Sequence, residues 1–152
     1  FNVLGRRQDP NGAYSAVIPK WISAQIGGDT VVINGDGETS RDFCYVENVV
    51  QANILAATDE KKERHEVFNI AVGDRNTLNN LNSLIASVLA TRGFINNKQP
   101  EYRDFRGGDV RHSQASIDKA CKALGYTPTF SLEQGLNGCV DWYIASLKQR
   151  VS

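Results

Sequence analysis

The 152-residue sequence contains no methionine, only three cysteines and two histidines, and no excess of either charge, with 17 basic and 17 acidic side chains. A complete reading frame begins with methionine, so we expect a processed, trimmed or fragmentary chain; its start lacks the basic, apolar and small-residue succession of a signal peptide. Zero net charge removes any overall attraction to nucleic acid. No apolar run approaches the roughly 18–20 residues of a membrane helix. Neither nucleic acid nor a membrane is therefore an expected partner.

The scarce cysteines and histidines argue against two further classes of site. Cys44, Cys121 and Cys139 are odd in number and widely spaced, which favours thiols in a reducing cytoplasm over a disulfide framework or a zinc site. His65 and His112 have no second histidine or cysteine at ligand spacing. We therefore expect a cytoplasmic protein without a metal centre.

Helix and strand signals alternate along the chain, and the apolar content of 41% is ordinary for a globular protein. Strands are few and short, so we expect a mixed α/β architecture with too little sheet for a self-contained doubly wound domain. The expected helices are Ala16 to Ile26, Val46 to Thr58, Thr77 (as cap) to about Thr91, Ser116 to Leu124 and one opened by the Ser131 to Gln134 capping box. The expected extended segments are Val31 to Ile33, Arg41 to Tyr45 and Val67 to Ile70.

Common catalytic and cofactor-binding motifs are absent from the sequence, which lacks G-x-G-x-x-G, G-x-x-x-x-G-K-[ST], H-E-x-x-H and G-x-S-x-G. The Asn34 to Gly37 stretch favours tight turns over a phosphate cradle. Three polar loops, residues 5–12, 37–43 and 102–111, place arginines beside glycine or aspartate. Such arginines can bind phosphate bidentately, or they can form salt bridges within the loop, and spacing alone leaves both open. Trp21 could pack on a base or sugar, although a buried tryptophan is commoner.

Four blocks in order resemble one known family. They are Phe1-Asn2-Val3-x-Gly5-Arg6-Arg7-Gln8-Asp9-Pro10, Val17-Ile18-Pro19-Lys20-Trp21, Asn34-Gly35-Asp36-Gly37-x-x-x-Arg41-Asp42-Phe43-x-Tyr45-Val46 and Arg106-x-Gly108-Asp109-Val110. From Phe1 to about Leu147 the chain resembles the C-terminal half of nucleotide-sugar epimerases, which are extended short-chain dehydrogenase/reductases. The likeness is greatest to UDP-N-acetylglucosamine 4-epimerases, which supply sugars for polysaccharide biosynthesis.

The resemblance implies a fold and a domain organisation. Residues 1–152 would form the C-terminal part of the epimerase, mainly its nucleotide-sugar-binding lobe, with a few elements of the Rossmann domain. Residues 46–75 would pack on or into the absent NAD-binding domain, so we expect an exposed apolar patch that favours self-association. The family's usual homodimer forms through the half that this chain lacks.

The resemblance also implies roles for individual residues. Asn2 would contact the substrate diphosphate, and Phe1 would lie near the nicotinamide of NAD. Arg41 and Arg106 match the two arginines that hold the diphosphate, and Asp109 matches the aspartate that accepts a hydrogen bond from the ribose. The nucleotide site would be lined by Ala16, Val17, Lys20 and Trp21, with Val32 and Asn34 flanking the uracil. Asn34 stands where many members carry an aromatic residue.

Ser113 occupies the position that shapes the sugar pocket in this family. A tyrosine there accompanies plain galactose or glucose, whereas a small side chain leaves room for a 2-acetamido group. A surface serine with no such role is the alternative. A second departure from the family is Glu47, which replaces an aspartate, so the helix is expected to begin at Asn48 instead.

The sequence lacks the family's glycine-rich turn and its Tyr-x-x-x-Lys. The chain would therefore carry no catalytic residue, leave NAD mainly to the absent half, and be inactive alone. The intact protein would be an NAD-dependent isomerase that epimerises UDP-N-acetylglucosamine or UDP-glucose through a transient 4-keto sugar. The alternatives are a dehydratase, reductase or decarboxylase of nucleotide sugars, or a non-catalytic domain that binds them.

Overall fold

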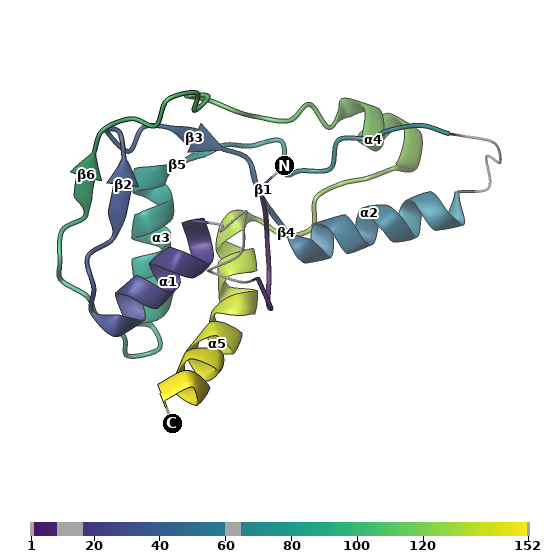
Figure 1. Cartoon of the computed structure of the whole chain (residues 1–152). Helices are drawn as coiled ribbons and strands as arrows, with labels where there is room; N and C mark the ends of the chain where they lie inside the picture. Colours follow the sequence, from purple (N-terminus) through teal and green to yellow (C-terminus); the bar gives the residue numbers. More distant parts are fainter. Residues whose placement is uncertain (1, 9–16, 60–64, 152) are drawn as a thin grey trace.

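The structure, a computed structural model, describes residues 2–8, 17–59 and 65–151 (Figure 1). Its strands are β1 (Asn2–Leu4), β2 (Val32–Asn34), β3 (Ser40–Arg41), β4 (Phe43–Tyr45), β5 (Asn76–Thr77) and β6 (Glu101–Arg103). Its helices are α1 (Val17–Gly27), α2 (Val46–Thr58), α3 (Leu78–Ala90), α4 (Asp118–Leu124) and α5 (Leu132–Val151). The predicted mixed α/β fold with few, short strands is confirmed.

The six strands form three separate two-stranded pairs. β1 and β4 run parallel, with Asn2 opposite Phe43, and β2 and β6 run parallel, with Asn34 opposite Arg103. β3 and β5 are antiparallel. Each pair is too short to be stable alone, so the helices that cover them hold them in place.

The helix ends follow the sequence signals. Thr77 caps α3, because its hydroxyl accepts a hydrogen bond of 3.1 Å from the backbone N–H of Asn80. The capping box of α5 is reciprocal: the N–H of Ser131 donates to Gln134 at 2.8 Å, and the N–H of Gln134 donates to the Ser131 hydroxyl at 3.3 Å. Gly125, with φ of +66°, closes α4. These predictions are confirmed.

The main core lies where α1, α3 and α5 pack together beside β1, β2 and β4 (Figure 1). Its fully buried residues include Ile22, Ile33, Leu81, Ile85, Leu136 and Val140. Burial also raises the pKa of the Cys139 thiol to about 11, so that thiol stays protonated near neutral pH. Cys44, Cys121 and Cys139 are all free, as expected.

Tyr45, at the end of β4, is the main contact between the parallel β1–β4 pair and α5. A Cβ at Gly135 would lie 2.7 Å from the Tyr45 Cβ, and one at Gly138 would lie 2.9 Å from the Tyr45 hydroxyl oxygen. Only glycine lets the helix approach the ring so closely. Further along α5, the Tyr143 hydroxyl donates a 2.7 Å hydrogen bond to the carbonyl of Gly5, just after β1.

A second, smaller core joins α2 to α4 and the segment before β5 (Figure 1). Tyr126 is fully buried there and donates a 2.8 Å hydrogen bond to the carbonyl of Ala71. Phe68 and Ile70 are half-buried against the same cluster. The chain is therefore built around two apolar clusters, joined through β4 and the start of α2.

Two expectations about this region are wrong. Val67 to Ile70 forms no strand; instead Lys119 of α4 donates a 2.9 Å hydrogen bond to the carbonyl of Val67 and lies 4.8 Å from the centre of the Phe68 ring. No described strand pairs with this segment, so its apolar residues serve the second core.

The helix expected to begin at Asn48 begins at Val46, directly after β4. Asn48 is not a cap, since its buried side chain binds the backbone of residues 129 and 130. Its Oδ1 accepts from the N–H of Thr129 at 2.9 Å and of Phe130 at 3.0 Å. Its Nδ2 donates to the Phe130 carbonyl at 2.8 Å.

The outer face of α2 carries an apolar stripe that the two clusters leave uncovered. Val50 and Ile54 are 43% and 57% exposed, and Ala57 completes the stripe one turn further on. Residues spaced by three and four positions share one face of a helix, so the stripe is continuous. The expected exposed apolar patch is therefore confirmed.

Candidate functional site

The loop that carries the predicted sugar and ribose contacts runs alongside β3. The N–H of Ser40 donates to the carbonyl of Arg111 at 2.9 Å, and the N–H of Ser113 donates to the carbonyl of Ser40 at 3.1 Å. The hydroxyl of Ser40 also hydrogen-bonds Nδ1 of His112 at 2.8 Å. These contacts hold half-buried Ser113 next to the strand that bears Arg41.

Arg41 is half-buried and uses one guanidinium nitrogen to hold this loop. Its Nη1 donates to the carbonyl of Ser40 at 2.9 Å and to that of Arg111 at 3.3 Å. A guanidinium has five N–H donors in a planar fork, so donors remain for a ligand. The arrangement fixes the side chain without using up its capacity to bind an anion.

Arg106 and Asp109 lie at the two ends of one tight turn. The N–H of Asp109 donates to the carbonyl of Arg106 at 3.2 Å, and Gly108 supplies a φ of +85°. Both side chains are exposed, and neither forms an ion pair or a side-chain hydrogen bond in the part of the chain that the structure describes. A free guanidinium and a free carboxylate are therefore presented to solvent three residues apart.

The predicted nucleotide-lining residues lie where α1 meets β2. Trp21 is 5% exposed and donates a 3.2 Å hydrogen bond from Nε1 to the carbonyl of Val32. The structure thus places Trp21 in the core, where it fixes β2. Val17 and Asn34 are half-buried and Lys20 is exposed, so these side chains are open to a ligand at least in part.

Asn2 is exposed on β1 and lies opposite Phe43 of β4. Phe43 follows Arg41 by two residues in the sequence. The pairing brings the first block of the sequence next to the β3–β4 segment. Phe1 and Ala16 lie outside the described residues. The structure therefore brings together Asn2, Arg41 and Ser113 around β3 and β4, and groups Trp21 with Val32 at the start of β2.

Asp42 belongs to this region, although sequence reasoning assigns it no role. It is fully buried, and its carboxylate accepts hydrogen bonds from the N–H groups of Val72 at 3.1 Å, Gly73 at 3.0 Å and Ala115 at 3.4 Å. Since neighbouring side chains of an extended segment point to opposite faces, Asp42 points inward where Arg41 points outward. Phe43, Cys44 and Tyr45 are buried as well, so the signal that could have identified Asp42 is a carboxylate at the start of an otherwise apolar run.

The β2–β3 turn is a tight turn, as its glycines predict. Gly35 and Gly37 have φ of +84° and +80°, which glycine adopts without strain. Asp36 forms a 2.6 Å ion pair with Arg111. Hydrogen bonds from Arg111 and from the N–H of Glu38 hold the pKa of the Asp36 carboxyl below its usual range. This ion pair joins the 102–111 loop to the β2–β3 turn, so it is not a salt bridge within one loop, and the choice between phosphate binding and salt bridging within each loop stays open.

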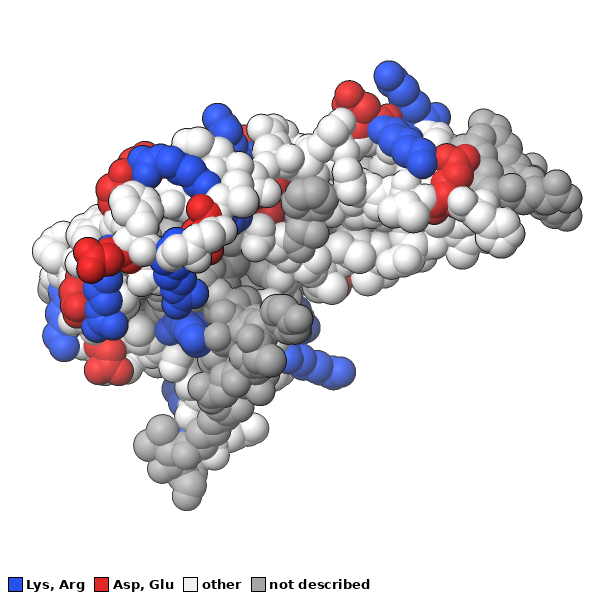
Figure 2. Space-filling view, turned by 45° about the horizontal axis from the view of Figure 1, so that its top comes forward, with Lys and Arg blue, Asp and Glu red and all other residues white. Residues whose placement is uncertain are grey.

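Charged side chains of both signs gather over the β2–β6 end of the molecule, in the view from above (Figure 2). They include the exposed pair of Arg103 and Glu101, whose Nε and Oε1 atoms lie 2.7 Å apart. The described residues contain no group of three or more candidate metal ligands. Among them, too, no helix has the length and apolar character to cross a membrane.

Comparisons with known proteins give one consistent result. The sequence model of the NAD dependent epimerase/dehydratase family matches residues 1–71. A putative UDP-glucose 4-epimerase of Methanocaldococcus jannaschii is 33% identical over 93% of this chain and 43% of its own length. A UDP-N-acetyl-alpha-D-glucosaminuronate decarboxylase of Bacillus cytotoxicus is 30% identical over 94% of this chain and 44% of its own.

The solved structures agree. A UDP-N-acetylglucosamine 4-epimerase of Methanobrevibacter ruminantium, in complex with UDP-N-acetylmuramic acid, superposes with a TM-score of 0.84 at 41% identity. The match covers 96% of this chain and 44% of that one. The chain thus spans less than half the length of the curated relatives that it matches.

Proposed function

We propose that this chain, which belongs to the NAD dependent epimerase/dehydratase family and matches the C-terminal half of its UDP-sugar 4-epimerases, forms the UDP-sugar-binding part of such an enzyme. The reaction would be an isomerisation at C4 of the sugar. The observation that supports this best is the pair of outward-facing arginines on adjoining segments, Arg41 on β3 and Arg106 on the loop beside it.

In this proposal the two arginines bind the diphosphate. Each guanidinium fork can bind phosphate oxygens bidentately, and charge-assisted hydrogen bonds of this kind are about twice as strong as neutral ones. Arg41 is held in place by two backbone carbonyls, and the Arg106 side chain has no ion pair or hydrogen bond within the described residues. With one fixed and one free arginine, a ligand could first contact Arg106 on the loop and then bind Arg41 on the strand.

The remaining contacts are assigned around this pair. Asp109 would accept hydrogen bonds from the ribose hydroxyls, and Asn2 would donate to the diphosphate. The uracil would lie near α1 and β2, against Val17, Lys20, Val32 and Asn34, with Trp21 supporting that surface from the core. Ala16 and Phe1 are assigned to the nucleotide site and to the nicotinamide by resemblance alone.

NAD would supply transient oxidation at C4 when it is bound to the whole enzyme. This chain does not fit it as a resident cofactor, because the sequence has no G-x-G-x-x-G turn to receive a pyrophosphate and no Tyr-x-x-x-Lys. We therefore assign no catalytic residue here. The residues of this chain bind and orient the substrate, and we expect the chain alone to be inactive.

We further propose that the sugar is N-acetylated, as in UDP-N-acetylglucosamine. Ser113 is small and half-buried, and its backbone is fixed beside β3. In Ser113→Tyr the ring would fill the space of a 2-acetamido group. In the protein expressed from its complete reading frame, kcat/KM for the N-acetylated substrate should therefore fall at least tenfold more than kcat/KM for UDP-glucose. Equal effects on both substrates would reject the assignment.

Calorimetric titration of UDP-N-acetylglucosamine, on the protein expressed from its complete reading frame, tests the binding site. Arg106→Ala and Arg41→Ala should each weaken binding by roughly 10- to 100-fold, as expected when a charged hydrogen bond is lost. Lys122→Ala on α4 removes one exposed positive charge away from the site and is the control. Unchanged affinity in both arginine variants would overturn the proposal.

A decarboxylase of nucleotide sugars is the second candidate, since one such relative is 30% identical over almost the whole chain. Both activities use the same UDP contacts, so the residues of this chain do not separate them. Product analysis does: an epimerase interconverts two UDP-sugars of equal mass, whereas a decarboxylase releases CO2. A protein that binds UDP-sugar and yields neither product would be a binding domain.

We also propose that residues 46–75 pack on the NAD-binding domain of the whole enzyme. The exposed stripe of Val50, Ile54 and Ala57 on α2 supports this, since an apolar helix face of this kind is normally covered. The homodimer expected for the whole enzyme would form elsewhere.

A further inference from the structure

The segment that bears Arg106 and Asp109 has almost no core of its own. Every residue from 101 to 110 is exposed. A loop without buried side chains takes its conformation from a few specific contacts. Any contact that fixes the 106–109 turn therefore also fixes the direction of its guanidinium and its carboxylate.

Two residues tie this turn to the β2–β3 turn from either side. Phe105, which immediately precedes Arg106, lies with its ring against Gly35. Arg111, two residues after Asp109, forms the 2.6 Å ion pair with Asp36. We name Gly35, Asp36, Phe105 and Arg111 the Phe105 clasp.

The two halves of the clasp also contact each other. The Arg111 guanidinium carbon lies 5.4 Å from the centre of the Phe105 ring, within cation–π distance. The ring thus lies between Gly35 on one side and a cation held by Asp36 on the other. Gly35 is required twice, since its φ is +84° and any Cβ there would collide with the Phe105 ring.

The clasp is too exposed to matter much for overall stability. Arg111 and Asp36 are 48% and 47% exposed, and ion pairs at such sites contribute little to folding. A displacement of a binding group by about 1 Å, by contrast, can lower a rate or affinity up to about 100-fold. The consequence of losing the clasp should therefore appear in ligand binding.

We infer that Phe105, Arg111 and Asp36 are positioning residues that hold Arg106 and Asp109 in the orientation that binds a nucleoside diphosphate. This rests on the function proposed above. None of the three needs to touch the ligand. Asp36 gives the most discriminating test, because an anion repels a diphosphate. By electrostatics alone, removing the Asp36 charge should strengthen binding of the nucleoside diphosphate. If Asp36 acts through the clasp, its removal should weaken that binding.

The test compares variants of the protein made from its complete reading frame, with KM, kcat and the Kd for UDP measured for each. Asp36→Asn, Phe105→Ala and Arg111→Ala should each raise KM and Kd roughly tenfold with kcat and Tm nearly unchanged. Phe105→Tyr and Arg111→Lys preserve the ring and the cation and should recover most of the affinity. The Asp36→Asn and Arg111→Ala effects should be strongly non-additive in the double variant.

Lys119→Ala is the matched control. Lys119, on α4, also forms an exposed ion pair, with Glu66 at 3.1 Å, and also lies over an aromatic ring, that of Phe68. It thus has the same kinds of contact as Arg111, on a different element. If Arg106→Ala weakens binding and the clasp variants behave like Lys119→Ala, the positioning role is overturned. If Asp36→Asn tightens binding while Arg111→Ala weakens it, Arg111 contacts the ligand directly and the inference is again wrong. If Arg106→Ala itself has no effect, the proposed function fails first.

Discussion

Buried polar side chains near the site work by joining backbone segments that are distant in sequence. Asp42 accepts from N–H groups before β5 and before α4, and Asn48 binds the segment before α5. A buried N–H that loses its acceptor costs about 1–3 kcal/mol. Asp42 therefore stabilises the backbone next to Arg41, and with it the position of the Arg41 guanidinium.

Asp42→Ala should lower the free energy of unfolding by about 3 kcal/mol, because one buried and two partly buried N–H groups lose their shared acceptor. Asp42→Asn keeps one acceptor oxygen, so its free energy of unfolding should lie between that of Asp42→Ala and that of the parent. Chemical denaturation measures both, with Asp74→Ala as the control, since Asp74 is exposed and, among the described residues, accepts a hydrogen bond only from the N–H of Arg75. A loss below 1 kcal/mol in Asp42→Ala would contradict the assigned role.

At this scale the sequence suggests roles for exposed residues more readily than for buried ones. Arginine beside polar turns can bind phosphate, which makes Arg41 a candidate, and its role as a phosphate ligand stays a prediction. Asp42 and Asn48 lie in the same stretch, but their partners are backbone groups 30 to 82 residues away. No local pattern encodes such distant acceptor–donor pairs.

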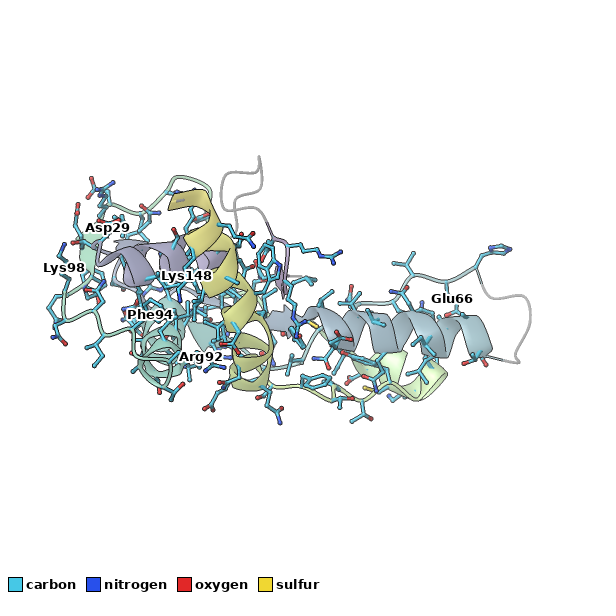
Figure 3. The ribbon with its side chains drawn as sticks, turned by 90° about the horizontal axis from the view of Figure 1, so that it is seen from below. Asp29, Glu66, Arg92, Phe94, Lys98 and Lys148 are labelled. Atoms are coloured by element: carbon cyan, nitrogen blue, oxygen red, sulfur yellow. The ribbon has the colours of Figure 1, made fainter. Side chains whose placement is uncertain are left out.

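Helices α3 and α5 pack through the main core, and Arg92, just beyond the last turn of α3, adds polar contacts between them. Arg92 donates to both Asp141 carboxylate oxygens, at 2.7 and 3.3 Å, and to the Asn137 side chain at 3.0 Å. It also donates to the carbonyl of Val88 at 3.1 Å, which satisfies one end group of α3. Figure 3 labels Arg92 where these two helices meet.

The Arg92–Asp141 pair predicts a dependence of stability on pH. The hydrogen bond from Arg92 holds the pKa of the Asp141 carboxyl below its usual range. A carboxyl with a depressed pKa contributes stability above its unfolded pKa, near 3.9, and loses it as pH falls through the folded value. Asp141 is 72% exposed, so the contribution is about 0.5–1 kcal/mol.

Asp141→Asn should therefore be less stable than the parent at pH 7, and the difference should shrink as pH falls below 4. Urea unfolding at several pH values measures it. Asp104→Asn is the control, since the Asp104 carboxylate is exposed and has no ion pair or hydrogen bond within the described segments. A difference that stays constant with pH would show that the charge of Asp141 is unimportant.

Elements with strong periodicity or caps were predictable, and those that depend on a distant partner were not. The stripe and cap of α3 and the capping box of α5 are local features. β6 was missed because Glu101, Tyr102 and Arg103 are all exposed and show no apolar alternation. Val67 to Ile70 shows the opposite error: its residues favour a strand, but no strand lies beside it.

The described residues of the molecule form two apolar clusters of unequal size, and the smaller is incompletely covered. In Figure 1, α2 and α4 extend away from the body formed by α1, α3 and α5. This shape leaves the Val50, Ile54 and Ala57 stripe in solvent. Burying such side chains contributes about 25 cal/mol per Å² of apolar surface, which favours contact with any apolar partner.

The 152-residue chain should therefore self-associate through α2. Val50→Glu combined with Ile54→Lys should abolish concentration-dependent association, as measured by sedimentation velocity, because both charges would be desolvated in a contact. Ile95→Lys, at another exposed apolar position, is the control and should leave association unchanged. A parent chain that sediments as a monomer at all concentrations would contradict the prediction.

The close approach of α5 to Tyr45 has a consequence for the order of folding during synthesis. Glycine in a helix costs roughly 1 kcal/mol relative to alanine, so the stretch around Gly135 and Gly138 has little tendency to form a helix before Tyr45 is in place. The two partners are 135 − 45 = 90 residues apart, so the contact closes late. While the ribosome makes the intervening chain, the aromatic face of the β1–β4 pair stays uncovered. Apolar surface that is exposed in this way favours aggregation until α5 emerges and covers it.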